Sequence, residues 1–398
     1  MKHPAWSCYP EGIGPSRRAF LKAVAAAAAA TSLSSPQRAF AQSKVTGGPN
    51  VGDGVPDDIP TGYPEGAVRL NFNENPIGPS RKAIDAVVKH DFYGSNRYNN
   101  IAPLNDVIAE HHRVSPKEVL IGCGSTEFLN ILPWTLLGDG GSMLLHDPAY
   151  GWSAKVAKSM GAKVVKVPLA PQGAMDADAL KKAYNDETRF VYIANPNNPT
   201  GSALPYKDIV SLAEALPKKA VLVVDEAYNV FLPPGKAGID LARDGAPVIA
   251  LRTFSKAYGL AGLRLGYAVA PEALIKKLQT YWMLDLSINA AAAAAVPAAL
   301  QDQEHLGRYV RTITEGVHLI RAGTKALGLE SYPHVAPFVM VDLGRKAAPV
   351  KKALLEKNVY VTDGKSWDKP TFLRVSVGLP EDDRRFLDAL GEVLPAHS

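Results

Sequence analysis

Short apolar runs that alternate with helical patterns constrain the fold of this chain more than any other feature of its sequence. Residues 190–194, 221–224 and 248–251 are almost wholly apolar, as expected for strands buried on both faces. Helical patterns separate these runs, and such alternation favours a mainly parallel sheet covered by helices on both sides. We therefore predict the α/β class, with one large domain over residues 104–299.

A second pattern begins near residue 300, where two longer helices alternate with two isolated strands and indicate a smaller α+β domain. We expect this domain to include the segment that precedes the large domain. A helix over residues 104–112 is expected to place His111 and His112 on a solvated face. The predicted organisation is a leader at 1–42, a flexible arm at 43–67, a small domain from 68–103 and 300–398, and a large domain at 104–299.

The leader resembles a twin-arginine export signal. Arg17 and Arg18 precede Phe20-Leu21-Lys22, an apolar stretch follows over residues 23–33, and an Ala-x-Ala cleavage site ends at Ala41. This order predicts export to the periplasm or beyond by the twin-arginine machinery, with cleavage after Ala41. An alanine-rich amphipathic helix or a disordered tail is the alternative.

The charge of the chain argues against a nucleic-acid partner. The formal net charge is +5, and residues 1–42 carry five basic residues against one acidic residue, so the remainder is close to neutral. No basic stripe with interleaved aromatic residues occurs, and no later segment has an apolar run long enough to span a bilayer. We expect neither nucleic-acid binding nor stable membrane association. The two cysteines, Cys8 and Cys123, give no zinc-type spacing, so no metal is predicted.

Lys256 follows a predicted buried strand and lies between hydroxyl residues and a glycine-rich stretch. Thr253, Ser255 and Arg264 could together hold a phosphate dianion. A lysine beside an anchored phosphate is well placed to form an imine with an aldehyde on the same cofactor. A surface lysine in a polar loop is an equally good reading of this segment alone.

Polar residues also follow the neighbouring predicted strands, where ligands bind in open α/β sheets. Asp225 ends a buried strand and needs a cationic partner, for which a pyridinium nitrogen would be suitable; a structural helix cap is the alternative. Asn198 and Tyr228 could hydrogen-bond a ring hydroxyl, and Tyr150 could stack on a ring.

Two further features could bind anions. Gly122 and Gly124 are followed by Ser125 and Thr126 at a predicted helix start, which is a ready anion site or simply a capped helix. Arg374, on a predicted strand, could hold a carboxylate bidentately, although a lone strand arginine is more often exposed. The chain lacks both a dinucleotide fingerprint and a Walker loop, which disfavours nucleotide binding.

Taken together, residues 68–390 resemble the fold-type I aminotransferases of class I/II that use pyridoxal phosphate, and within them the histidinol-phosphate aminotransferase subgroup. The resemblance rests on blocks in a specific order and spacing, at residues 71–79, 97–98, 122–127, 147–151, 195–201, 225–228, 253–266 and 373–378.

The resemblance implies a role for each candidate residue. Lys256 would be the Schiff-base lysine that also moves the substrate proton, and Asp225 would pair with the pyridine nitrogen. The remaining cofactor contacts would come from Asn198 and Tyr228 at the ring oxygen, Tyr150 at the ring face, and Ser125, Thr126, Thr253, Ser255 and Arg264 at the phosphate. Tyr98 would reach the phosphate of a neighbouring subunit, which implies a homodimer with shared active sites. Arg374, with Asn73 and Asn289, would bind the substrate.

One departure from the subgroup bears on the substrate. Histidinol-phosphate enzymes commonly carry an arginine for the substrate phosphate where this chain has Thr362, and Asp285 and Asp363 add negative charge nearby. We therefore expect transfer of an amino group between a non-phosphorylated amino acid or related amine and a 2-oxo acid. Another reaction of the same cofactor, as in a C–S lyase, decarboxylase or racemase, and an exported non-catalytic cofactor-binding protein are the alternatives.

Overall fold

The computed structural model of the chain describes residues 63–90, 96–234 and 236–394. The predicted leader and most of the predicted arm lie outside these residues. Among the described residues, no helix combines the length and apolar character needed to cross a membrane.

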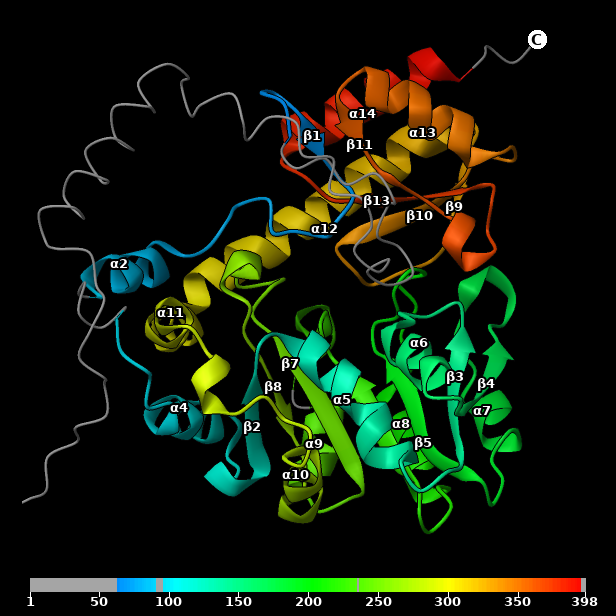
Figure 1. The fold of residues 1–398 in the computed structure, drawn as a ribbon. Coiled ribbons are helices and arrows are strands. Elements are labelled where there is room, and N and C mark those ends of the chain that lie inside the picture. The colour runs from blue at the N-terminus through cyan, green and yellow to red at the C-terminus, as the bar shows by residue number, and fades with distance from the viewer. Residues whose placement is uncertain (1–62, 91–95, 235, 395–398) are drawn as a thin grey trace, which may run out of the picture. The chain divides into compact units, whose positions relative to one another are not determined.

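A seven-stranded sheet forms the centre of the fold (Figure 1). Strand β8 is antiparallel to both of its neighbours, and the other neighbouring pairs are parallel. This confirms the predicted α/β class with a mainly parallel sheet. In spatial order the strands are β2 (Val119–Gly122), β8 (Gly266–Val269), β7 (Val248–Thr253), β6 (Val221–Asp225), β5 (Thr188–Ala194), β3 (Ser142–Asp147) and β4 (Lys163–Pro168).

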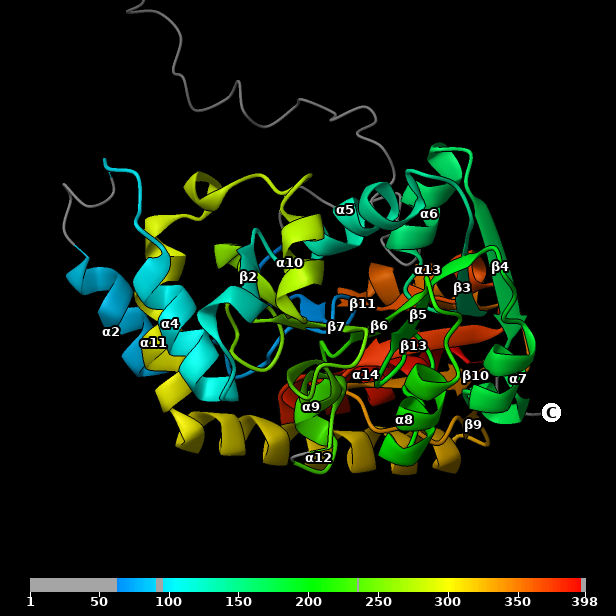
Figure 2. The same ribbon diagram turned by 90° about the horizontal axis from the view of Figure 1, so that it is seen from below.

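Helices cover both faces of this sheet, which explains why its central strands are apolar on both sides. On β6, Leu222 and Val224 pack into one core, whereas Val221 and Val223 pack into the other. Figure 2 shows α5, α6 and α10 on one side of the strands and α8 and α9 on the other. The first side has α5 (Ser125–Leu137), α6 (Trp152–Ser159) and α10 (Glu272–Leu278); the second has α4 (Ala102–His112), α7 (Ala177–Lys182), α8 (Tyr206–Glu214) and α9 (Gly238–Arg243).

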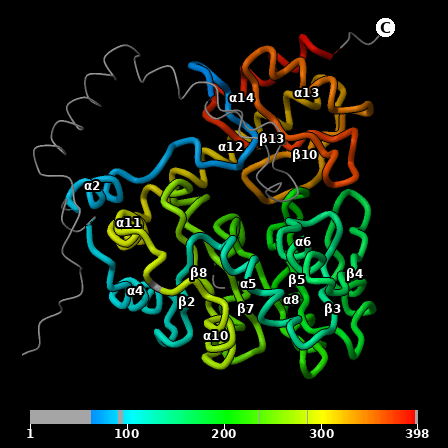
Figure 3. Tube along the Cα trace, viewed as in Figure 1, coloured from blue at the N-terminus to red at the C-terminus, as the bar shows by residue number. Residues whose placement is uncertain are grey.

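The C-terminal part of the chain forms a second, antiparallel sheet of four strands (Figure 3). Its order is β12 (Thr362–Asp363), β13 (Phe372–Ser376), β10 (Phe338–Asp342) and β9 (Glu330–Ser331). Strand β1 (Val68–Arg69) pairs in parallel with β11 (Val359–Tyr360) beside it. Apolar side chains of these strands pack against α12 (Gln303–Ala326), α13 (Ala347–Glu356) and α14 (Pro380–Val393).

Helix α2 (Arg81–Lys89) packs against α11 (Ala290–Gln301), so residues assigned from the sequence to the small domain contact a helix assigned to the large one. Helix α11 continues through Pro297, and alanines that allow close approach fill most of it. Ser80 caps α2 by accepting a hydrogen bond from the backbone N–H of Ala83. The expectation that both histidines of α4 are solvated is wrong for His112, whose Nε2 lies 2.7 Å from the Tyr267 hydroxyl.

Candidate active site

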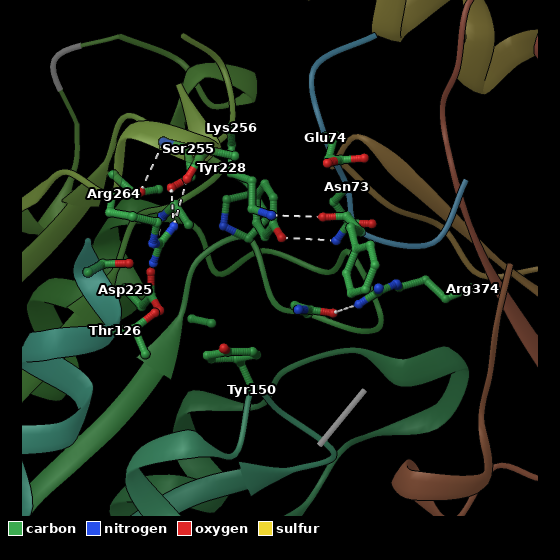
Figure 4. A pocket seen from close by; sticks show the side chains of 18 residues that line it. Asn73, Glu74, Thr126, Tyr150, Asp225, Tyr228, Ser255, Lys256, Arg264 and Arg374 are labelled. Carbon is green, nitrogen blue, oxygen red and sulfur yellow. Dashed lines mark hydrogen bonds between the residues drawn. The ribbon is translucent and has the colours of Figure 1, made fainter. Parts of the chain in front are cut away.

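A cavity of about 320 Å³ lies where the carboxyl ends of β5, β6 and β7 and the first turn of α5 meet residues 72–74 and β13 (Figure 4). All of the predicted site residues except Tyr98 and Asn289 line it. The sheet therefore brings together side chains that are up to 301 positions apart in the sequence, from Asn73 to Arg374. In the described part of the chain, no three His, Cys, Asp or Glu side chains are grouped to hold a metal ion.

One end of the cavity is built to receive an anion. Ser125 and Thr126 begin α5, whose first N–H groups have no partner within the helix. Arg264 lies against this turn, since a Cβ on Gly124 would be 2.7 Å from its Nη2 atom. Gly124 also has a φ of +77°, which favours glycine, and a Cβ on Gly266 would be 2.4 Å from the Ser125 nitrogen. Both glycines leave the backbone open at this point.

Lys256 projects into the same cavity from the loop after β7. Its Nζ donates a hydrogen bond to the Phe72 carbonyl at 2.8 Å. Burial, followed by the positive charge of Arg374, lowers the pKa of Lys256 to about 8. At pH 7 roughly a tenth of the side chain is then the neutral, nucleophilic amine, far more than for an ordinary lysine.

Asp225 ends β6 and is only 5% exposed. Its Oδ2 accepts a hydrogen bond from the Tyr192 hydroxyl at 2.9 Å, and its Oδ1 accepts one from the Ala227 N–H at 3.2 Å. Burial raises the pKa of Asp225 to about 6, and its carboxylate forms no ion pair with any described residue. The sequence reasoning missed Tyr192. In the structure Ala194 is paired with Asp225 and Tyr192 precedes Ala194 by two, so Tyr192 faces the same side of the sheet as the carboxylate; the sequence alone does not give this pairing.

Tyr228 and Asn73 connect the two sheets across the cavity. Asn73 Nδ2 donates to the Tyr228 hydroxyl at 3.0 Å, and the Ser376 hydroxyl donates to Asn73 Oδ1 at 2.7 Å. Both polar atoms of the Asn73 side chain thus have protein partners, so its position favours orienting Tyr228 over the predicted direct contact with substrate. Ser376 was not singled out from the sequence.

Arg374 carries the most unusual charge in the site. It is 4% exposed, and Nη1 and Nη2 donate to Asn198 Oδ1 and the Asn71 carbonyl, each at 2.6 Å. Its Nε has no hydrogen-bond partner, and no carboxylate of a described residue pairs with it. Burial lowers the pKa of Arg374 to about 10, so it remains cationic at neutral pH. A buried guanidinium in this state is ready to receive a carboxylate.

Thr362 lies beside this arginine, as the pairing of β12 with β13 requires. It is buried, and its hydroxyl donates to the Asn71 carbonyl at 3.0 Å. Asp363 projects elsewhere and pairs with Lys351 at 3.4 Å. The expectation that Asp363 adds negative charge to the substrate region is therefore wrong, because adjacent strand residues face opposite sides. The side chain of Asp285 lies outside the described part of the chain.

Two predicted site residues do not reach the cavity. Asn289 caps α11, accepting from the Ala292 N–H at 2.8 Å and donating to the Leu263 carbonyl at 2.7 Å. Its predicted role at the substrate has no support in this arrangement. Tyr98 is 83% exposed, and its predicted reach into a neighbouring subunit stays a prediction.

Comparison with known proteins gives a consistent result. The family model for aminotransferase class I and II matches residues 65–390. The chain is 36% identical over 336 residues to histidinol-phosphate aminotransferase 1 of Dechloromonas aromatica, covering 83% of this chain and 91% of the relative. The crystal structure of histidinol-phosphate aminotransferase from Sinorhizobium meliloti in complex with pyridoxal-5'-phosphate has a TM-score of 0.76 and 28% identity, covering 82% of this chain and 90% of that one. Aspartate aminotransferase from Thermus thermophilus, at 24% identity and a TM-score of 0.74 over 82% of this chain and 92% of that one, shares the fold.

Proposed function

The chain belongs to the aminotransferase class I and II family and is a pyridoxal-phosphate-dependent transaminase, and from this premise we propose that its amino donor is a non-phosphorylated amino acid or related amine. The amino group would pass to a 2-oxo acid. The observation that carries the proposal is the small number of cations in the cavity, which leaves a single arginine, Arg374, for the anionic group of the donor.

The described residues fit the cofactor. The glycine-flanked turn of α5 and Arg264 form a cradle for a phosphate dianion. The buried Asp225 carboxylate, which has no cationic partner among the described residues, fits a protonated pyridine nitrogen. Lys256 lines the same cavity as these two groups, and Tyr150 supplies an aromatic wall. Tyr228 and Asn198 carry the polar atoms available to a ring oxygen.

When bound, pyridoxal phosphate supplies a reactive aldehyde and a ring that withdraws electrons from the substrate carbon. Lys256 provides the amine for attachment and, once released by the donor, a base for the α-proton, because its pKa near 8 leaves part of it neutral. Asp225 keeps negative charge at the ring nitrogen. Arg374 orients the donor through its carboxylate, so that the α-hydrogen faces the lysine.

The substrate proposal follows from counting positive charges. The cations that line the described cavity are Lys256, Arg264 and Arg374. Lys256 reacts, Arg264 lies at the cofactor phosphate cradle, and Arg374 is left for the anionic group of the donor. Thr362, which stands where the related enzymes commonly have an arginine, is neutral and bonded to the backbone. A phosphorylated donor would therefore meet Arg374 alone, with no second described cation for the larger charge of a phosphate.

A donor panel tests this proposal. The holoenzyme is mixed with histidinol phosphate, histidinol and a set of L-amino acids, and the cofactor absorbance and the oxo product are followed. Histidinol and its phosphate form a matched pair that differ only in the phosphate. We expect the best non-phosphorylated donor to exceed histidinol phosphate in kcat/KM by at least about tenfold. A ratio of this size is expected when one charge of the substrate phosphate lacks a cationic partner in the site. A higher kcat/KM for histidinol phosphate than for every other donor would overturn the proposal.

We also propose that two copies of the chain associate to complete the active sites. Support comes from apolar side chains left exposed on the segment before α11 and around it: Tyr98, Trp134, Tyr281, Met283, Leu284 and Leu286. This segment is tied to the loop of Tyr98, since Asn99 Nδ2 donates to the Ile288 carbonyl at 2.7 Å. Sedimentation should give a dimer, and Tyr98→Phe should weaken cofactor binding; a monomer with full activity would exclude the proposal.

Export by the twin-arginine pathway remains a proposal that rests on the leader sequence. Its test is mass spectrometry of the protein from a cell fraction outside the cytoplasmic membrane. We expect the mature chain to begin at Gln42. Replacement of both leader arginines, Arg17→Lys and Arg18→Lys, should block export and retain the uncleaved precursor in the cytoplasm. Recovery of intact Met1 to Gln42 on exported protein would contradict cleavage after Ala41.

A further inference from the structure

Tyr192 is a completely buried tyrosine on β5 whose hydroxyl lies 2.9 Å from Asp225 Oδ2. It packs in the core beneath α5 and α6, among apolar side chains such as Phe190 and Val223. A buried tyrosine hydroxyl needs a hydrogen-bond partner, and this one has a carboxylate that faces the cofactor cavity. The residue itself does not line that cavity.

The sheet register fixes this contact. Ala194 of β5 is paired with Asp225 of β6, and side chains two residues apart on a strand face the same side. Tyr192 therefore approaches the carboxylate from the neighbouring strand, while the Ala227 N–H approaches Oδ1 from the loop after β6. Each carboxylate oxygen thus receives one donor from the protein, and a group held at two points has little freedom to rotate.

The charged and titratable groups around Asp225 come from several elements. They are Tyr192 of β5, Tyr150 of the loop after β3, Glu226 and Tyr228 of the loop after β6, and Lys256 of the loop after β7. Burial is the largest influence on Asp225 and raises its pKa to about 6, whereas the Tyr192 hydrogen bond is the largest opposing influence. Burial also raises the pKa of Tyr192 well above its usual value, so it stays a donor throughout the range where the enzyme works.

We propose that Tyr192 is a positioning residue for pyridoxal phosphate: its hydroxyl holds the Asp225 carboxylate in one orientation and keeps it ionised under mildly acidic conditions, so that it binds the protonated ring nitrogen. The role requires no contact between Tyr192 and the cofactor. It follows that removing this hydroxyl weakens cofactor binding most strongly at the acidic end of the pH range, where Asp225 without its donor takes up a proton.

The test is a titration of the apoprotein with pyridoxal phosphate between pH 5 and 8, with the dissociation constant measured at each pH. For Tyr192→Phe, which keeps the ring, we expect the acid-side loss of affinity to begin about one pH unit higher than in the unchanged protein. The dissociation constant at pH 6 should rise about tenfold, with a smaller change at pH 8. The titrations of the cofactor and of Lys256 are common to both proteins and cancel in the comparison.

Tyr267→Phe is the matched control. Tyr267 is also a buried tyrosine of the same sheet, but its hydroxyl contacts His112 Nε2 at 2.7 Å rather than a site residue. Its removal should leave the dissociation constant and its pH dependence unchanged. Thermal unfolding of the apoproteins shows whether the two variants are equally folded.

A second substitution tests the sign of the effect. 3-Fluorotyrosine at position 192 is a more acidic, stronger donor of nearly the same shape, so it should move the acid-side loss to lower pH. If Tyr192→Phe does not fold, the protein with 3-fluorotyrosine at position 192 still tests whether the hydroxyl at this position keeps Asp225 ionised. A wild-type pH profile for Tyr192→Phe, the same shift in Tyr267→Phe, or no downward shift with 3-fluorotyrosine would each overturn the proposal.

Discussion

Replacement of Arg374 by glutamine tests whether its unmatched charge serves the substrate carboxylate. The guanidinium is 4% exposed and has no carboxylate partner among the described residues, and its Nε also lacks a hydrogen-bond partner. Folding has therefore buried a charge without neutralising it, which costs several kcal/mol unless a ligand compensates. Glutamine is shorter and uncharged but keeps a polar side chain with an amide donor, so we expect the fold to persist.

The expected magnitude follows from this burial. A substrate carboxylate facing glutamine loses its charge partner in a site with little solvent, a loss of about 3–5 kcal/mol. The corresponding fall in kcat/KM for an L-amino acid is roughly 10²- to 10⁴-fold. Arg374→Lys keeps the charge but not the planar pair of donors, so its loss should be intermediate.

The same substitution also acts on Lys256. Arg374 is the largest charge that lowers the pKa of Lys256, so its removal should raise that pKa and move the pH–rate profile upward. This change in the pKa of Lys256 is the same for every substrate, so it can be separated from the loss of the contact between Arg374 and the substrate carboxylate. An L-amino acid and the amine that lacks its carboxyl group are compared in single-turnover reactions at pH 9, where Lys256 is mostly neutral.

We expect the loss for the amino acid to exceed the loss for the amine by at least about tenfold. The fold of each variant is checked by cofactor binding, which does not involve the carboxylate. If both donors lose activity equally, Arg374 acts on the lysine or on the structure alone, and the assignment of its charge to the substrate is refuted.

Three further predictions follow from the site and the core. Lys256→Ala should abolish transamination while its circular dichroism and melting temperature stay close to those of the unchanged protein, because the side chain is partly exposed to the cavity. Gly124→Ala should raise the dissociation constant of pyridoxal phosphate, measured by titration of the apoprotein, by about ten- to a hundredfold. A Cβ would lie 2.7 Å from Arg264 Nη2, and the backbone at φ +77° and ψ 162° strains alanine by roughly 1–3 kcal/mol. Asp383→Asn should stabilise the apoprotein at pH 8 by about 1–3 kcal/mol in denaturant unfolding, and by less at pH 5. Burial raises the pKa of Asp383 to about 7 in the native protein, against 3.8 in the unfolded chain. The stability of the unchanged protein therefore falls as pH rises between these two values, and asparagine removes this loss. An equal effect at both pH values would refute the last of these.

Much of the site was predictable because its residues directly follow buried strands. Asp225 ends an apolar run, and Lys256 lies just beyond the next one, so a parallel sheet must bring them to one edge. The anion turn at Ser125 was likewise recognisable, since glycines before a helix start expose backbone N–H groups. Local patterns of this kind do not depend on knowing which strand pairs with which.

The contacts that escaped prediction all join segments that are distant in the sequence. The sequence does not reveal that β5 and β6 are neighbours in register, and without that pairing Tyr192 reads as one more core aromatic. The same holds for Ser376, whose bond to Asn73 spans 303 positions. Helix α14 was also not predicted, although Phe386, Ala389 and Leu390 give it a buried apolar side at helical spacing.

Strand alternation explains why Thr362 and Asp363 must be weighed differently. The two are consecutive on β12, so one faces Arg374 and the other faces α13 and Lys351. The charge of Asp363 is thus neutralised away from the substrate. The side chain at position 362 lies directly beside the Arg374 guanidinium, so whether that side chain is neutral or charged affects the substrate site. The proposed discrimination against a phosphorylated donor therefore rests on an absent second cation rather than on an added anion. An absent cation weakens binding of the phosphate without repelling it, so histidinol phosphate should remain a poor substrate with raised KM rather than an inert one.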